Sequence, residues 1–423
     1  MIAPRIIFQE CKKAFTSPII LALLILFSAY NIYLIYDSSV YKDELHVVNE
    51  LAETYGVNIT DESLSKLDQD LKSDLIDFNM ITEKKSSQTF SSAHDFFEQL
   101  RFEDQELYTE EERQFLSNVY LKEVYFSSAR MIDKTYKKID IVSFGELEIN
   151  NYGLSGTDAE KLRKQYAQLA NRFDELQEND EHKQWFFNGK QYLMHKLLFK
   201  TVFKHIIFES IILLVLATAL ITNYEFENRT HLVAYTAKRG RRLMLDKLAA
   251  SLIVVMIMTT LLIIITLGTY FTVFDYSYLF KSSISSAFNW EADLPYISWW
   301  SMSFFTYLIL GIVLMYVCML LFSVVTFVIS VMVKNSYYTF FLFGAVFAVL
   351  FMIQRFVSTS SSLIFITGFN LSALVSFPQV WFMSNRGLIL FKYYELMTIS
   401  VWTIIIVVLC IFCLRRFKKQ AIV

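Results

Sequence analysis

Six runs of about 20 apolar residues constrain this chain more than any other feature of its sequence, because a helix needs about 20 such residues to cross roughly 30 Å of hydrocarbon. The runs fall at residues 18–36, 203–222, 248–273, 303–332, 336–354 and 396–414. Because 54% of all residues are hydrophobic and only 19% are charged, the composition is that of a membrane protein. We therefore expect an all-α polytopic membrane protein with six transmembrane helices.

Lysine and arginine collect at one set of span ends, and this predicts the orientation. With the amino terminus in the cytoplasm, every short inner segment carries basic residues, as the positive-inside rule requires. These residues are Lys12, Lys13, Arg229, Lys238, Arg239, Arg241, Arg242, Lys247, Lys334, Arg415, Arg416, Lys418 and Lys419. We expect a multi-pass protein of the bacterial cell membrane, with both termini cytoplasmic and with membrane lipids around the spans.

Residues 37–200, between the first two spans, differ in composition from the rest of the chain. They contain 32 of the 41 acidic residues and 20 of the 39 basic ones, so the segment is acidic while the whole chain has a net charge of only −2. None of the four cysteines lies in this segment, which is therefore expected to fold without disulfides, as in a bacterial envelope. We expect a soluble extracytoplasmic domain inserted between the first and second spans.

The inserted segment is predicted to be mostly helical. Thr109 with Glu112, and Thr157 with Glu160, have the spacing of a capping box, which marks the start of a helix. Apolar residues then recur at three- and four-residue spacing, which indicates helices with one buried face. Residues 139–149 are the exception, since their pattern predicts a short strand pair or a loop.

The amino-terminal part, residues 1–36, combines the first span with an elbow helix. Residues 2–18 combine apolar side chains, among them Ile6, Ile7 and Phe8, with four charged ones, so this segment is predicted to lie flat on the inner membrane surface. A generic charged flank of the first span is the alternative.

The carboxyl-terminal part, residues 201–423, contains the other five spans and one broken apolar segment. Residues 356–394 are apolar but are interrupted by Gly368, Asn370 and Pro378. We expect an outer re-entrant hairpin, with its irregular backbone shielded by protein. A seventh span is the alternative, although it would place the final basic residues outside the cell.

Two residues at the start of the second span are candidates for a transport pathway. His205 and Glu209 lie four residues apart, so one face of a helix can present both as metal or proton ligands, but an interfacial ion pair is the favoured interpretation. Glu209 is expected to point toward protein, because a charge that faces lipid is costly. Two ligands do not complete a metal site, so no metal is expected.

Enzymatic motifs are missing from the sequence. It contains no nucleotide-binding loop, zinc-protease helix or nucleophile elbow. We therefore expect no catalytic residues and no cofactor bound by this chain.

The connector between the second and third spans, residues 225–247, carries more charge than a topology signal needs. Its arginines satisfy the positive-inside rule and suit anionic lipids. Glu225 and Glu227 precede Thr230, which is suited to cap a helix, and Gly240 is suited to end it. The apolar residues of this short helix are Leu232, Val233 and Tyr235.

This connector resembles that of the membrane subunits of the type 2 ABC exporter family, in the subgroup with a large extracytoplasmic domain between the first and second spans. In that family an acidic pair, a threonine, a short helix and an arginine-rich turn ending in lysine join the second and third spans. The order of elements is also similar: an elbow helix, six spans, a broken outer hairpin and a basic tail. The chain has Arg229 where the family often has glycine.

The resemblance implies that the connector is a coupling helix, which docks in a groove of a separate cytosolic ABC ATPase. That subunit, and not this chain, would bind ATP and magnesium. The residues that stand at coupling positions are Glu225, Glu227, Arg229, Thr230, Leu232, Val233, Tyr235, Arg239, Arg241, Arg242 and Lys247.

The resemblance also implies a cargo and a second membrane subunit. Six spans make half of a usual exporter, so a homodimer or a heterodimer with a second permease is expected. The cargo would be a peptide, a drug or another envelope-active compound, such as an antimicrobial peptide, moved out of the cell for resistance or immunity. No nucleic acid is expected as a partner.

Two other classes of function are open to the same sequence. A membrane-anchored sensor or scaffold would use its acidic outer domain to bind a partner or a cationic peptide. An intramembrane enzyme is disfavoured, because no complete set of ligands or nucleophiles is present. A neighbouring gene for an ATPase without spans would favour the exporter, and a neighbouring kinase gene would favour the sensor.

Overall fold

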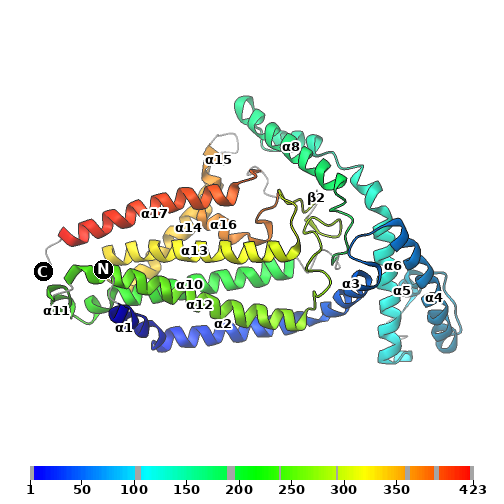
Figure 1. The fold of residues 1–423 in the computed structure, drawn as a ribbon, viewed down its shortest axis with the longest axis horizontal. Coiled ribbons are helices and arrows are strands. Elements are labelled where there is room, and N and C mark those ends of the chain that lie inside the picture. The colour runs from blue at the N-terminus through cyan, green and yellow to red at the C-terminus, as the bar shows by residue number, and fades with distance from the viewer. Residues whose placement is uncertain are drawn as a thin grey trace.

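A bundle of long helices forms one part of the molecule, and a group of amphipathic helices covers one end of it (Figure 1). The computed structural model describes residues 4–100, 106–187, 196–237, 240–291, 294–357, 363–384 and 390–419. Both termini lie at the same end of the bundle, which we call the terminal end. The opposite end, beside the amphipathic helices, is called the domain end.

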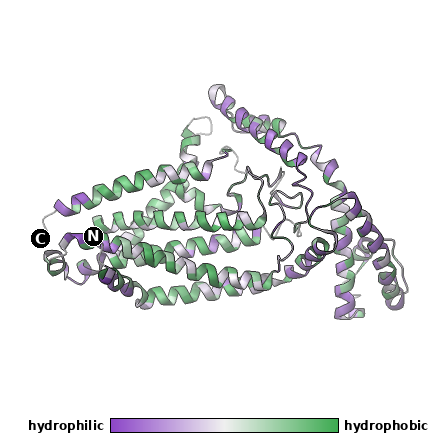
Figure 2. Cartoon of the chain, in the orientation of Figure 1, coloured by the Kyte–Doolittle hydropathy of each residue, from purple (hydrophilic) through white to green (hydrophobic). Residues whose placement is uncertain are grey.

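Six of the described helices are long and apolar enough to cross a membrane, and they correspond to the six predicted spans. They are Pro18–Tyr55, with α2 (Pro18–Asp37), η1 (Ser38–Tyr41) and α3 (Lys42–Tyr55); Lys196–Glu227, with the π-helical η3 (Lys196–Val202) and α10 (Phe203–Glu227); Gly240–Val273, with η4 (Gly240–Arg242) and α12 (Leu243–Val273); α13 (Phe304–Val333); α14 (Ser336–Phe356); and α17 (Tyr394–Lys419). Figure 2 shows the apolar residues concentrated along them. By the length and composition of these helices, the chain is a multi-pass membrane protein.

Helix α10 lies at the centre of the bundle. In its most apolar window 72% of the residues are buried within the chain, compared with 17% in α2, 11% in α14 and 22% in α17. It packs against α12, α13, α14, α2 and the amino-terminal helix α1 (Pro4–Phe15). The hydroxyl groups of Thr218 and Ser323 form a hydrogen bond of 3.1 Å between α10 and α13. Because so little of α2, α14 and α17 is buried within the chain, these outer helices expose wide apolar faces, as spans in contact with lipid do.

The inserted segment is helical, as predicted. After α3 come α4 (Asp61–Ser86), α5 (Ala93–Gln99), α6 (Glu110–Tyr136), α7 (Ile141–Asn151) and α8 (Gly156–Glu178). The predicted capping box at α6 is confirmed, since the Thr109 hydroxyl accepts the backbone N–H of Glu112 and the Glu112 carboxylate accepts that of Thr109. Helices α4, α5 and α6 enclose a small core of their own, with Phe78, Phe96 and Leu116 at its centre.

The prediction of strands or a loop at residues 139–149 is wrong, because these residues form most of α7. The carboxylate of Asp140 accepts the backbone N–H of Ser143 at 3.0 Å and caps the helix. Ile141, Gly145 and Ile149, four residues apart, are buried. A Cβ atom on Gly145 would lie 2.5 Å from the ring of Tyr166, so glycine permits the close packing of α7 on α8.

The predicted capping box at Thr157 and Glu160 is also wrong. Helix α8 begins at Gly156, so Thr157 already lies in its first turn, and the preceding Ser155 makes no side-chain capping bond. Gly156 has a φ of +58°, a conformation that glycine adopts without strain and that lets the chain enter the helix before Thr157.

The loop between α12 and α13 joins the inserted segment to the bundle. It contains two short antiparallel strands that the all-α prediction did not include, β1 (Trp290–Glu291) and β2 (Leu294–Pro295), with Trp290 opposite Pro295. Its Phe288 ring stacks on Trp185, with 5.7 Å between the ring centroids. The guanidinium of Arg172, on α8, donates to the carbonyl of Ser298 at 3.0 Å.

Within the predicted segment 356–394, the described residues between α14 and α17 form short helices and contribute none of the six long ones. They contain α15 (Leu363–Gly368), α16 (Leu371–Ser376) and the 3-10 turn η5 (Pro378–Val380). Every residue of α16 is buried, and the Asn370 side chain caps its amino end by accepting the N–H of Ser372 at 2.9 Å. The indole N–H of Trp381 donates to the carbonyl of Leu374 at 2.8 Å. Helix α16 is thus enclosed by protein, as a re-entrant hairpin requires, whereas Leu363 and Ile366 of α15 are more than half exposed.

Candidate functional site

The charged residues at the two ends of the connector are buried within the protein. Glu225, at the end of α10, is 7% exposed, and Lys247, near the start of α12, is 0% exposed. The two side chains form an ion pair. The Lys247 ammonium also donates to the carbonyls of Ile221 at 2.5 Å and Thr222 at 3.2 Å. A buried lysine without a carboxylate partner would be costly, so each residue of this pair depends on the other.

Helix α1 supplies two further members of this charge cluster. Lys13 donates to Glu225 at 2.7 Å and to Glu10 at 2.8 Å, and Glu10 lies 3.8 Å from the Lys247 ammonium. Burial lowers the pKa of Lys13, but the carboxylates of Glu10 and Glu225 outweigh this effect and hold it above its ordinary value. We call Glu10, Lys13, Glu225 and Lys247 the four-charge cluster. It joins α1, α10 and α12 at the terminal end.

The short helix of the connector is present as α11 (His231–Thr236), but its aromatic residue faces inward. Tyr235 is 5% exposed, and its ring contacts those of Phe226 and Phe417, with centroid distances of 5.5 and 5.3 Å. The prediction that Tyr235 belongs to a partner-binding surface therefore does not fit this structure. The apolar ring of Tyr235 fills the space between α11, α12 and α17.

Other predicted coupling residues bond to neighbouring parts of the chain. The Glu227 carboxylate accepts the backbone N–H of Ser336 at 2.6 Å, at the start of α14. The helix dipole stabilises a negative charge at this position. Arg241 donates to the carbonyl of Lys418 in α17. Thr230 occupies the N-cap position of α11, but its side chain makes no capping hydrogen bond, contrary to the prediction. Arg239 lies outside the described residues.

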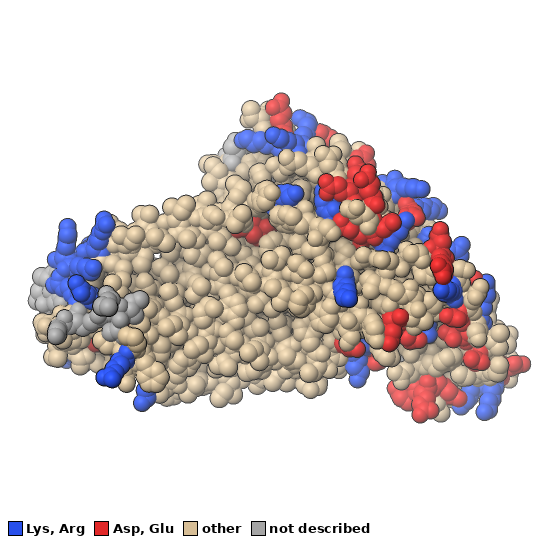
Figure 3. Space-filling model, viewed as in Figure 1, with Lys and Arg blue, Asp and Glu red and all other residues tan. Residues whose placement is uncertain are grey.

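The remaining connector residues form an exposed face. Leu232 is 48% exposed and Val233 is 77% exposed. Arg229 and Arg242, on either side of α11, are exposed as well. Arg229 has a φ of +56°, a left-handed conformation that an arginine seldom adopts. A glycine at this position would adopt the same conformation without strain. Figure 3 shows other lysine and arginine side chains at this end of the molecule, and the acidic ones mostly at the domain end.

His205 and Glu209 both lie near α2 but contact different residues there. Glu209 is 5% exposed, so the prediction that it points toward protein is confirmed, and its carboxylate accepts the amide N–H of Asn31 at 2.7 Å. The His205 ring packs edge-on against that of Tyr30, with 5.2 Å between the centroids. Within the described residues, no group of three or more His, Cys, Asp and Glu side chains is placed to hold a metal ion.

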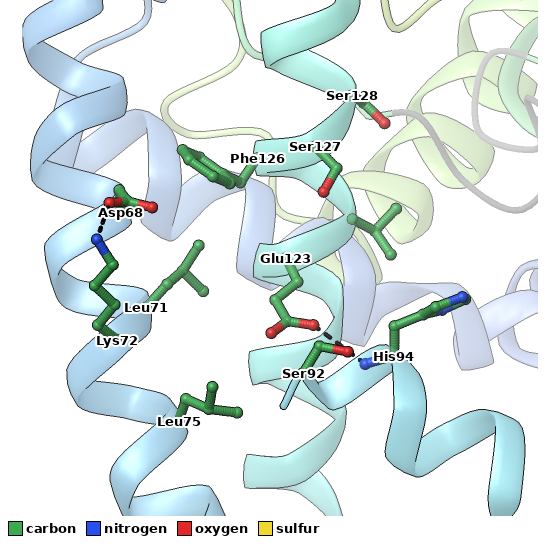
Figure 4. Close-up of a pocket in the computed structure, with 11 residues that line it drawn as sticks. Asp68, Leu71, Lys72, Leu75, Ser92, His94, Glu123, Phe126, Ser127 and Ser128 are labelled. Carbon is green, nitrogen blue, oxygen red and sulfur yellow. Dashed lines mark hydrogen bonds and ion pairs between the residues drawn. The ribbon is translucent and has the colours of Figure 1, made fainter. Parts of the chain in front are cut away.

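The inserted segment contains a cleft of about 590 Å³ between α4, α5 and α6. Figure 4 shows Leu71, Leu75 and Phe126 on its walls, with charged side chains at its margins. The carboxylate of Glu123 accepts the backbone N–H of His94 at 3.1 Å, near the start of α5. The cleft therefore combines apolar walls with both signs of charge, which suits an amphipathic ligand better than a metal ion.

Sequence reasoning missed the partners of the buried charges. Glu10, Lys13 and Asn31 were not among the candidate residues, although Asn31 is a polar residue within an apolar run and Glu10 is an acidic residue in an amphipathic segment. Both patterns indicate side chains that need a polar partner inside the protein. Which partner each one meets depends on helix packing, which the sequence alone does not reveal.

Comparisons with protein-family models, with curated proteins and with solved structures find no match for this chain.

Proposed function

We propose that this chain is the permease subunit of an ATP-driven ABC exporter. The observation that supports the proposal best is the connector, whose short helix presents Leu232 and Val233 to solvent while the residues around it bond to other helices. Exposed aliphatic residues between arginines suit an interface in which apolar contacts give affinity and charges give orientation. A cytosolic ATPase, holding ATP and magnesium, is the proposed partner.

The contacts of the connector provide a route from such a partner to the bundle. The four-charge cluster links it to α1, α10 and α12. Glu227 links it to α14, and Arg241 links it to α17. Because these contacts are short-range and mostly charge-assisted, a displacement of α11 would act on five helices at once.

The topology of the proposed exporter follows the charge distribution. The terminal end faces the cytoplasm of a bacterial cell, α1 lies along the inner membrane surface, and the inserted domain is outside. The charged side chains visible at the terminal end are mostly basic, whereas the domain end carries most of the acidic ones together with further basic ones, and this distribution supports the orientation (Figure 3). The cargo is an amphipathic peptide, a drug or another envelope-active compound.

A second membrane subunit is proposed to pack against α14. This helix is the least buried of the six, and Tyr337, Phe341 and Val349 are more than half exposed. A second copy of the chain, or a sister permease, would cover this surface. Native mass spectrometry of the purified complex gives the number and identity of the membrane subunits.

Co-purification of ATPase activity tests the proposal. The tagged full-length chain, extracted from its native membrane in detergent, is expected to carry magnesium-dependent ATPase activity. Leu232→Asp with Val233→Asp places two charges on the proposed docking surface, and the co-purified activity is expected to fall about tenfold or more. Because both side chains are exposed, the variant is expected to keep the yield and melting temperature of the wild-type chain.

Val142→Asp is the matched control. Val142 is also an aliphatic residue, 53% exposed, but it lies on α7 in the inserted domain. This variant is expected to retain the ATPase activity. If the wild-type chain brings no ATPase activity, or if both variants lose it equally, the permease proposal is wrong.

A sensor is the second candidate function, and the cleft between α4, α5 and α6 favours it. In that case the domain would bind an amphipathic or cationic peptide, and the bundle would relay the signal to a different cytosolic partner. Replacement of Leu75 by Arg, in the wall of the cleft, would abolish the response to the peptide, while no ATPase would co-purify.

A further inference from the structure

Glu209 lies inside the membrane-spanning part of the chain, and its carboxylate is held by neutral groups. The Nδ2 atom of Asn31, on α2, lies 2.7 Å from the carboxylate and 3.0 Å from the hydroxyl oxygen of Thr266, on α12. Asn31 and Thr266 are 0% exposed and Glu209 is 5% exposed. The other atom of the amide, Oδ1 of Asn31, has no hydrogen-bond partner among the described residues.

Among the described residues, no lysine, arginine or histidine forms an ion pair with the Glu209 carboxylate. His205 lies one turn away on α10, with its ring against Tyr30 of α2, and the neighbouring Lys204 is exposed. The only charged residues of α12 are Asp246 and Lys247, near its opposite end, where Lys247 pairs with Glu225. Helix α13 contains no charged residue. Helix α1 contacts α10 near that same opposite end. The only charged residue of α14 is Arg355, which is exposed in its last turn.

The same atoms can hold this carboxyl group in two charge states. When Glu209 is ionised, the Asn31 amide donates to it, as the structure shows. When Glu209 is protonated, a half-turn of the amide places Oδ1 where it accepts the carboxyl proton and the Thr266 hydroxyl proton. Both arrangements keep the heavy-atom distances, because the nitrogen and oxygen of an amide are nearly equal in size and a hydroxyl group donates as well as it accepts.

We propose that Glu209, Asn31 and Thr266 form a proton-binding site within the bundle, at the junction of α2, α10 and α12. The proton binds to the Glu209 carboxylate, which becomes neutral, and no other co-reactant is needed. Ionisable groups inside membrane spans commonly serve as proton-binding groups when they have a polar partner that accommodates both states. This site is separate from the connector, and its existence does not depend on the identity of any cytosolic partner.

Infrared spectroscopy of the purified full-length chain in lipid nanodiscs tests the proposal. The spectrum of Glu209→Gln, which keeps the shape of the side chain, is subtracted from the wild-type spectrum across a pH series. The difference is expected to show a protonated carboxyl band at low pH that converts to a carboxylate band at high pH. In Asn31→Leu the midpoint is expected at higher pH, because the N–H donor to the carboxylate is lost.

Glu225→Gln is the matched control, since Glu225 lies on the same helix but pairs with Lys13 and Lys247. Its difference spectrum is expected to show a carboxylate across the pH range in which Glu209 titrates. A Glu209 band that stays protonated, or stays ionised, at every pH would overturn the proposal. If Glu209→Gln does not fold, the difference between wild type and Asn31→Leu reports the same titration, and a pH-independent difference would count against it.

Discussion

At the scale of a single residue, Arg172 stabilises the inserted segment through a buried ion pair. Its guanidinium donates to both carboxylate oxygens of Glu181, at 3.0 and 2.6 Å, and both side chains are 7% exposed. Arg172→Leu leaves Glu181 as a buried charge without its main partner. We expect a loss of about 3 kcal/mol or more, seen as a lower melting temperature of the chain in detergent.

Arg163 provides the control for this prediction. It also bonds to both oxygens of a carboxylate, that of Glu146, but its side chain is 51% exposed. Water solvates both charges after Arg163→Leu, so the melting temperature is expected to change little. Equal effects of the two replacements would show that burial of the Arg172 pair is unimportant.

His182 makes the stability of the chain depend on pH. Burial, with Lys183 beside it, holds the pKa of His182 below its ordinary value of 6.5. As pH falls below 6.5 the unfolded chain takes up the proton before the folded chain does, so stability contributed by the neutral ring is lost toward acid pH. His182→Gln removes this titration, and its melting temperature is expected to vary less than that of the wild type between about pH 5 and 8.

His94→Gln is the comparison for the pH series. The His94 side chain is 58% exposed, in the same inserted segment. Its replacement is expected to preserve the wild-type pH profile. A profile that is unchanged by His182→Gln would contradict the assignment to His182.

Single residues were predicted from the sequence only in part. The burial of Glu209 followed from the cost of a charge in a span. The inward positions of Glu225, Lys247 and Tyr235 did not follow, because a connector rich in charge has the same sequence pattern whether it faces a partner protein or its own bundle. The packing of α1 against α10 and α12 determines that these side chains face the bundle. This packing joins residues as far apart as Lys13 and Glu225, which are 212 positions apart in the sequence.

Helix α1 illustrates the scale of the element. It is amphipathic, and its polar side supplies Glu10 and Lys13, two members of the four-charge cluster. Charge as well as apolar contact therefore attaches α1 to the bundle. Lys13→Met removes one of the two cations that contact both Glu10 and Glu225, the one that α1 itself supplies. We expect faster amide hydrogen exchange across residues 4–15, because α1 then separates from the bundle more often.

Lys12→Met is the matched control for α1. Lys12 is the preceding residue, of the same type, but it is exposed. Its replacement is expected to leave hydrogen exchange in α1 at the wild-type rate. The same increase in both variants would mean that α1 is not held by the four-charge cluster.

Elements were predicted well where one strong signal existed. Each apolar run became a long helix, since burial of backbone groups in an apolar medium leaves few other structures. The capping box of α6 was predicted by its spacing, whereas the start of α8 was not, because the left-handed Gly156 changes where the helix begins. Helix α7 was missed because short apolar segments suit strands and helices equally until their packing partner is known.

At the scale of the whole molecule, the sequence predicted a mostly helical chain with six long apolar helices, and the structure has both. Composition alone separates an acidic segment from apolar spans. The contacts between them, such as Arg172 with the loop before α13, join distant residues and leave no periodic pattern in the sequence. These contacts decide how the domain sits on the bundle.

The first long helix has a mechanical consequence. From Pro18 to Tyr55 the chain stays helical over 38 residues, and the 3-10 turn η1 separates α2 in the bundle from α3 in the inserted segment. Helix α2 alone has 20 residues, which is about 30 Å at 1.5 Å per residue, so a tilt of about 10° about one end moves the other by about 5 Å. Because only two residues separate α1 from α2, a tilt of α2 about its domain end would displace α1 and the four-charge cluster.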